Sequence, residues 1–75
     1  MSQKKIEKLI DIGKKHNCEF YLPPFYKGST NPFFDITNIV GKQSKMVVFM
    51  GEIARQIKTH KNVKVEDRTY IELWL

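Results

Sequence analysis

The chain has 75 residues, a single cysteine and a formal net charge of +5 at pH 7. A chain of this length builds one core, which excludes a separate substrate domain or a deep cleft, so we expect residues 1–75 to form one compact domain. No apolar run approaches the roughly 20 residues of a membrane span, and no signal-peptide pattern is present. Cys18 alone cannot form an internal disulfide, which fits a reducing cytoplasm.

The first predicted element is a helix over residues 3–16. Ser2 is a plausible N-cap, and apolar or small residues follow at helical spacing: Ile6, Leu9, Ile10 and Gly13. Asp11 precedes Lys15 by four residues, which favours an ion pair on the exposed face. Positive charge in the last turn suits the helix dipole, and Asn17 can end the helix in a left-handed turn.

Two strands come next, separated by a loop rich in aromatic residues. Residues 18–22 are typical of a short strand ended by Pro23-Pro24, and residues 33–40 of a second strand. The intervening loop has Pro24 and Pro32 near its ends and Gly28 at its tip. We expect a rigid flap with Phe25 and Tyr26 turned inward and Lys27 outside. Residues 23–26 also match the PPxY pattern that WW domains bind, which is the alternative for this stretch.

Residues 45–60 are compatible with two structures. Met46, Met50, Ile53, Ala54 and Ile57 form one helical stripe, which favours a single helix of about sixteen residues. The run from Met46 to Met50 is also typical of a buried strand that ends at Gly51. We favour the helix, with Ser44 as its candidate cap and Gly51 marking close packing of the helix on the sheet.

Residues 63–66 and 69–75 alternate in polarity and predict two final strands joined by a turn. In the last strand, Ile71, Leu73 and Leu75 share one face, and Tyr70, Glu72 and Trp74 share the other. The element order is therefore helix-strand-strand-helix-strand-strand. It predicts an α+β two-layer sandwich, in which an antiparallel sheet of about four strands carries two helices on one face.

The positive charge is concentrated in the two predicted helices. Residues 1–17 carry +3 and residues 41–61 carry +4, whereas the remaining segments are slightly acidic. Six cationic residues are the candidate nucleic-acid-binding set: Lys4, Lys8, Lys15, Lys45, Arg55 and Lys58. Lysine outnumbers arginine eleven to two, which favours sequence-tolerant binding to phosphates over readout of bases. A solvated lysine-rich surface with no ligand is the alternative.

The outward face of the predicted sheet collects four aromatic residues, namely Tyr21, Phe33, Tyr70 and Trp74. Such a face can stack bases, but the strands and their loop carry a net negative charge that disfavours phosphates. Coverage by the loop of residues 23–32, or by a protein partner or a second subunit, fits this face better. A protein-interaction module or homodimer that uses these four residues is therefore the alternative function.

The residues usual for metal binding or catalysis are sparse. His16, Cys18 and His60 provide at most three soft ligands, fewer than the four of a closed zinc site. Cys18 beside a histidine has no evident orienting group for nucleophilic catalysis. We expect no metal, no cofactor and no enzymatic activity.

The half from Phe33 onward resembles pterin-4a-carbinolamine dehydratase. The resemblance lies in Phe49-Met50, Ile53-Ala54 and Tyr70-Ile71, and in the order of the elements. It implies a similar fold, but His60-Lys61-Asn62 stands where that family has its catalytic His-His-Pro, so only His60 carries over and a degenerate dehydratase is the third possibility. In its general character the chain is similar to small accessory proteins of large tailed phages with AT-rich genomes.

Overall fold

The computed structural model describes residues 2–74. Helix α1 (Gln3–His16) has the predicted bounds and caps. The Ser2 hydroxyl accepts a hydrogen bond from the Lys5 backbone N–H (3.2 Å), and Asn17 ends the helix with a φ of 57°. The Cys18 N–H then donates to the Gly13 carbonyl (2.9 Å), so the chain turns sharply from α1 toward the sheet.

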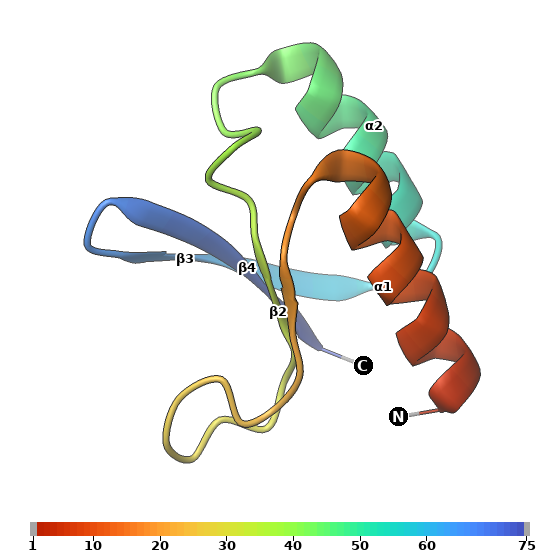
Figure 1. Cartoon of the computed structure of the whole chain (residues 1–75), viewed down its shortest axis with the longest axis vertical. Helices are drawn as coiled ribbons and strands as arrows, with labels where there is room; N and C mark the ends of the chain where they lie inside the picture. Colours follow the sequence, from red (N-terminus) through yellow and green to blue (C-terminus); the bar gives the residue numbers. More distant parts are fainter. Residues whose placement is uncertain (1, 75) are drawn as a thin grey trace.

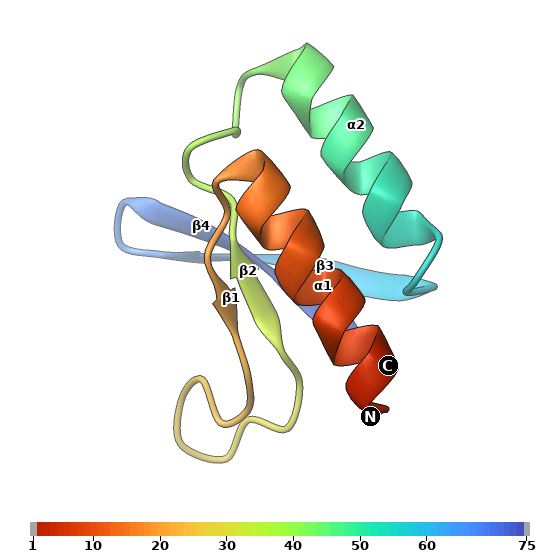
Figure 2. The same ribbon diagram turned by 45° about the vertical axis from the view of Figure 1, so that its right-hand side comes forward.

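The four strands form one antiparallel sheet in the order β1-β2-β4-β3. Their bounds are Phe20–Tyr21 for β1, Phe33–Asp35 for β2, Thr59–Val65 for β3 and Arg68–Trp74 for β4. Helices α1 and α2 (Gln43–Ala54) lie side by side on one face of this sheet, and the β3–β4 hairpin projects beyond them (Figures 1 and 2). The predicted α+β two-layer sandwich and its element order are confirmed.

Strands β1 and β2 are shorter than the sequence predicts. Strand β2 ends at Asp35, because the carboxylate of that residue accepts hydrogen bonds from the backbone N–H and the hydroxyl of Thr37 and turns the chain. Residues 37–41, expected in part to extend the strand, form turns instead. The short β2 still reaches the centre of the sheet, where it pairs with β4.

Residues 46–50 are helical, as the favoured interpretation predicts, but α2 ends at Ala54 rather than at His60. The six residues beyond it include Thr59 and His60, which belong to β3 because they pair with Trp74 and Leu73 of β4. The predicted cap at Ser44 is also wrong: Lys42 is the N-cap residue and makes no side-chain hydrogen bond there. Strand pairing across the sheet therefore overrides the helical periodicity of this segment.

The core lies between the helices and the sheet. Its fully buried side chains come from every layer: Leu9 of α1, Phe49 and Ile53 of α2, Phe34 of β2, and Ile71 and Leu73 of β4. Ile71 and Leu73 face the helices as predicted, whereas Leu75 lies outside the described residues. In residues 2–74 no helix combines the length and apolar character needed to cross a membrane.

The close approach expected at Gly51 occurs at Gly13 instead. A Cβ at Gly51 would meet no atom within 4 Å. A Cβ at Gly13 would lie 2.5 Å from the Cys18 carbonyl oxygen and 3.0 Å from the Phe34 ring. Gly13 therefore lets the end of α1 pack against the start of the sheet, and Gly51 is exposed on the outer side of α2.

Candidate nucleic-acid interface

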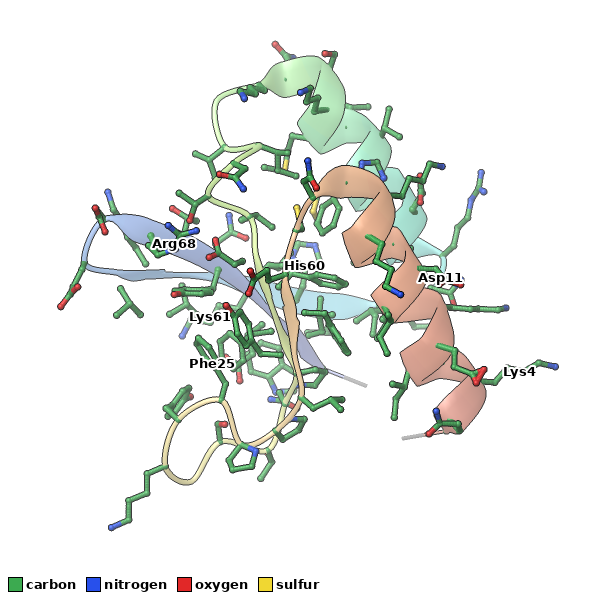
Figure 3. All side chains as sticks on the ribbon, in the orientation of Figure 1. Lys4, Asp11, Phe25, His60, Lys61 and Arg68 are labelled. Carbon is green, nitrogen blue, oxygen red and sulfur yellow. The ribbon has the colours of Figure 1, made fainter. Side chains whose placement is uncertain are left out.

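Helix α1 presents one row of charged side chains on the flank that faces α2. The row comprises Lys4, Lys8, Asp11 and Lys15, whose spacing of three or four residues keeps them on one face. Lys4 and Asp11 lie on the outer side of the helix, away from the sheet (Figure 3). From Lys4 to Lys15 the row extends about 16 Å along the helix axis, a length that corresponds to about five phosphates of one B-form strand.

Glu52 of α2 connects the two helices at the far end of this row. Its Oε1 lies 2.9 Å from the Lys15 Nζ and 3.1 Å from the His16 Nε2. The hydrogen bond from Lys15, followed by that from His16, holds the pKa of Glu52 below its ordinary value. Lys15 therefore pairs with Glu52 rather than with Asp11, the partner that the sequence predicts within α1.

A surface groove of about 340 Å³ runs between α1 and α2. We call it the helix groove and define it by its lining residues Lys8, Asp11, Ile12, Lys15, Glu52, Arg55 and Gln56. Lys8 and Arg55 make no ion pair with any residue in the range 2–74, so both cations remain available to a ligand. The groove combines three cationic side chains with two carboxylates.

The structure brings three of the six predicted cationic residues together, namely Lys8, Lys15 and Arg55. Lys4 continues the row one turn before Lys8. Lys45 lies in the first turn of α2, seven residues before Glu52, and Lys58 lies in the segment between α2 and β3. We expected the two helices together to carry a charge of +7, the sum of +3 and +4. This prediction is wrong because α2 ends at Ala54, and the cationic surface is smaller than the sequence predicts.

The aromatic face of the sheet is covered by the loop between β1 and β2. Phe25 points from the loop toward the sheet (Figure 3), and its ring centroid lies 4.8 Å from those of Tyr21 and Phe33 and 4.9 Å from that of Tyr70. Phe33 is 1% exposed, so it is not the open partner-binding residue that the alternative function requires. The flap is confirmed for Phe25, whereas Tyr26 packs edge-on against Phe33 and stays half-exposed.

The flap is held by its own hydrogen bonds. The Ser29 hydroxyl accepts from the backbone N–H groups of Phe25 (2.7 Å) and Tyr26 (3.2 Å), and Gly28 turns the tip with a φ of 85°. At the end of the loop, Asn31 donates to the Glu72 carboxylate of β4 (2.9 Å). These bonds fix the Pro23-Pro24-Phe25-Tyr26 stretch in a folded loop, which is unlike the extended polyproline helix that WW domains bind.

Three aromatic residues of the predicted partner face remain at least partly accessible, namely Tyr21, Tyr70 and Trp74. Tyr21 is half-buried, and its hydroxyl donates to Glu19 (2.8 Å), which together with burial raises the pKa of Tyr21 to about 12. Trp74 is 40% exposed at the end of β4, beside Thr59 of β3. The indole is therefore the main exposed ring of β4.

Cys18, His16 and His60 lie in three different settings. Cys18 is buried, and burial followed by the nearby Asp35 charge raises the pKa of its thiol, so the thiolate that catalysis requires is disfavoured. His16 packs edge-on against Phe49, and His60 is exposed on the edge strand β3. Within residues 2–74, no three His, Cys, Asp or Glu side chains are grouped so as to hold a metal ion.

A second hollow, of about 500 Å³, lies on the other side of α1 and includes Lys14, Asp35 and Arg68 in its wall. Sequence reasoning missed the ion pair between Asp35 and Arg68 in this wall. The available signal was an acidic residue inside the apolar run of residues 33–36, followed two positions later by Thr37. Its partner Arg68 is 33 residues away and could be identified only once the strands were paired.

Comparison of the chain with protein-family models, with curated proteins and with solved structures gives no match. The candidate function therefore depends on the chemistry of the surfaces described above.

Proposed function

We propose that the protein is a small non-catalytic module that associates with nucleic acid through the helix groove, with tolerance of sequence and in an accessory role in DNA or RNA metabolism. The main support is the convergence of Lys8 and Lys15 of α1 with Arg55 at the end of α2. Side chains from two elements that meet along one groove form a denser positive site than the same charges spread over a surface.

The chemistry of the groove favours phosphate as the bound group. Lys8 and Arg55 have no carboxylate partner in the described part of the chain, and Lys4 extends the row along α1. Ammonium groups bind phosphates as point charges, and a single arginine offers little capacity to read bases. Asp11 and Glu52 reduce the local positive charge, which favours moderate affinity. Because the attraction is electrostatic, the affinity should fall as salt is added.

The test is fluorescence anisotropy of a labelled oligonucleotide, single-stranded and duplex, over a series of KCl concentrations. The logarithm of the association constant should fall linearly with the logarithm of the salt concentration. The double variant Lys8→Ala/Arg55→Ala should bind at least about tenfold more weakly, and the slope should decrease by about two because two phosphate contacts are lost. Circular dichroism verifies that both proteins are folded.

The matched control removes two cations from another surface, in the variant Lys61→Ala/Lys64→Ala of β3. It should retain most of the affinity, because these side chains lie on the edge strand rather than in the helix groove. Equal weakening in both double variants would show diffuse attraction and contradict the assignment to the groove. Absence of binding by folded protein at low salt would exclude nucleic-acid association.

A second candidate function, a protein-interaction module or homodimer, is favoured by the exposure of Trp74. A tryptophan that is 40% exposed at the end of a strand is typical of an interface anchor. Analytical ultracentrifugation and the emission maximum of this sole tryptophan test the homodimer. A concentration-dependent dimer with a blue-shifted emission, lost in Trp74→Ala, would support it, and a monomer at all concentrations would exclude self-association.

A further inference from the structure

Strand β3 forms a long open edge of the sheet. In the order β1-β2-β4-β3 it is the terminal strand, and it pairs with β4 along all seven residues from Thr59 to Val65. The opposite edge, β1, has only two residues. An edge strand presents a row of N–H and C=O groups without partners, and proteins usually keep such edges short or covered. Within residues 2–74, no segment pairs with the outer side of β3.

The helix layer does not extend over β3. His60 and Asn62 lie opposite Leu73 and Ile71 of β4, so they point to the helix side of the sheet. Leu73 and Ile71 are fully buried, whereas His60, Asn62 and Lys64 are exposed. In Figure 1 the far half of the β3–β4 hairpin projects past both helices. Both faces beside the far half of β3 are therefore open, and a strand added there would meet no obstruction from the helices (Figures 1 and 2).

The charges of β3 discriminate among possible occupants of this edge. The strand contains Lys61 and Lys64 on opposite faces and no acidic residue, and Lys58 precedes it. Full antiparallel overlap with a second copy would set His60 of one chain opposite Lys64 of the other, and β3 itself has no carboxylate to compensate the lysines. Glu72 of β4 lies opposite Lys61 but accepts a hydrogen bond from Asn31. Lysines on an edge strand thus oppose pairing between copies and favour a partner strand with acidic side chains.

We propose that β3 binds an extended acidic segment of a protein partner as a fifth strand of the sheet. The backbone groups of the edge supply the hydrogen bonds, and Lys61 and Lys64 select carboxylates on the two faces. On the face away from the helices, half-buried Val63 and half-exposed Val65 provide apolar contacts for the alternate side chains. This proposal uses a surface separate from the helix groove and does not rest on nucleic-acid binding.

The probe is a capped synthetic peptide of valine and threonine with two glutamates three residues apart, so that one carboxylate lies on each face of the added strand. It is titrated into isotope-labelled protein. The amide signals of residues 59–65 should shift, and alternate amides of β3 should exchange more slowly with deuterated water, because their free N–H groups gain partners. Two further versions of this peptide carry methyl groups on alternate backbone nitrogens, one version at the odd and the other at the even positions. Only the version whose unmethylated N–H groups face β3 should bind. Equal binding of both methylated peptides would overturn strand addition.

Two double variants separate this proposal from the nucleic-acid function. Lys61→Ala/Lys64→Ala should bind the acidic peptide about tenfold more weakly, since each exposed ion pair contributes a factor of about three. Lys8→Ala/Arg55→Ala should bind it as the unchanged protein does. The reverse dependence, with shifts confined to the helix groove, would overturn the proposal, as would equal binding of a peptide with lysine in place of glutamate. None of these outcomes tests whether nucleic acid binds in the helix groove.

Discussion

Arg68, the first residue of β4, and Asp35, the last residue of β2, form an ion pair between the two central strands of the sheet. The Nε and Nη2 atoms of Arg68 lie 2.7 Å and 2.6 Å from Oδ2 of Asp35. The other carboxylate oxygen accepts from the N–H (3.0 Å) and the hydroxyl (2.6 Å) of Thr37, which in turn accepts from the Thr69 N–H (2.9 Å). Asp35 is only 6% exposed, so this network is what makes its burial tolerable.

The first prediction concerns the charge of Asp35. Asp35→Asn keeps the size of the side chain but places an amide where the guanidinium or Thr37 requires an acceptor. We expect the free energy of unfolding to fall by about 2 kcal/mol in urea denaturation. Asp11→Asn is the matched control, because Asp11 is exposed and forms no ion pair with another described residue, and it should change stability by less than about 0.5 kcal/mol. Equal effects of both substitutions would contradict the role of the network.

The same network predicts a loss of stability in acid. Burial alone would raise the pKa of Asp35, but the hydrogen bonds from Thr37 and the pairing with Arg68 outweigh it and lower the pKa. A lowered pKa stabilises the folded protein above the ordinary carboxyl value of about 4. That contribution is lost as the pH falls through the folded-state pKa.

Urea denaturation from neutral pH to about pH 3 measures this dependence. The unfolding free energy of the unchanged protein should decline with acidification, and that of Asp35→Asn should decline less. The residual slope of the variant includes Glu52, whose pKa is also lowered. Identical pH profiles for the two proteins would show that Asp35 does not contribute.

The third prediction compares two glycines, one in each helix. Gly13→Ala places a Cβ 2.5 Å from the Cys18 carbonyl oxygen, which is backbone and cannot move away readily. We expect it to destabilise the fold by about 2 kcal/mol or more. Gly51→Ala meets nothing within 4 Å and should stabilise the protein by about 0.5–1 kcal/mol, since alanine favours the helix. Thermal and urea unfolding measure both, and opposite signs are the expected result.

The fourth prediction concerns the flap. Phe25→Ala removes the ring that contacts Tyr21, Phe33 and Tyr70, and should lower the unfolding free energy by about 2 kcal/mol while exposing the sheet face. Faster proteolysis of residues 22–32 and increased binding of a hydrophobic dye should accompany the loss. Tyr26→Ala, at a half-exposed ring of the same loop, should cost less than about 1 kcal/mol. A Phe25→Ala protein with unchanged stability and proteolysis would show that the loop does not cover the face.

Local patterns in the sequence were sufficient for the first helix, the order of the elements and the inward ring of the flap. The caps of α1 follow from Ser2 and Asn17, whose effects act within one turn of the helix. The cationic row of α1 follows equally from spacing. Of the candidate set, however, the sequence could not place Lys58, because its position depends on where α2 gives way to β3.

Residues 1–75 by themselves determined which segments are amphipathic and which segments carry the excess positive charge. Only the tertiary structure decided that α2 ends at Ala54, that Phe33 is covered, that Glu52 pairs with Lys15, and that Asp35 meets Arg68. The first group depends on neighbours within a few residues. The second depends on strand register and helix packing between segments that are distant in the sequence or, for Phe33, on how the loop folds back over the sheet.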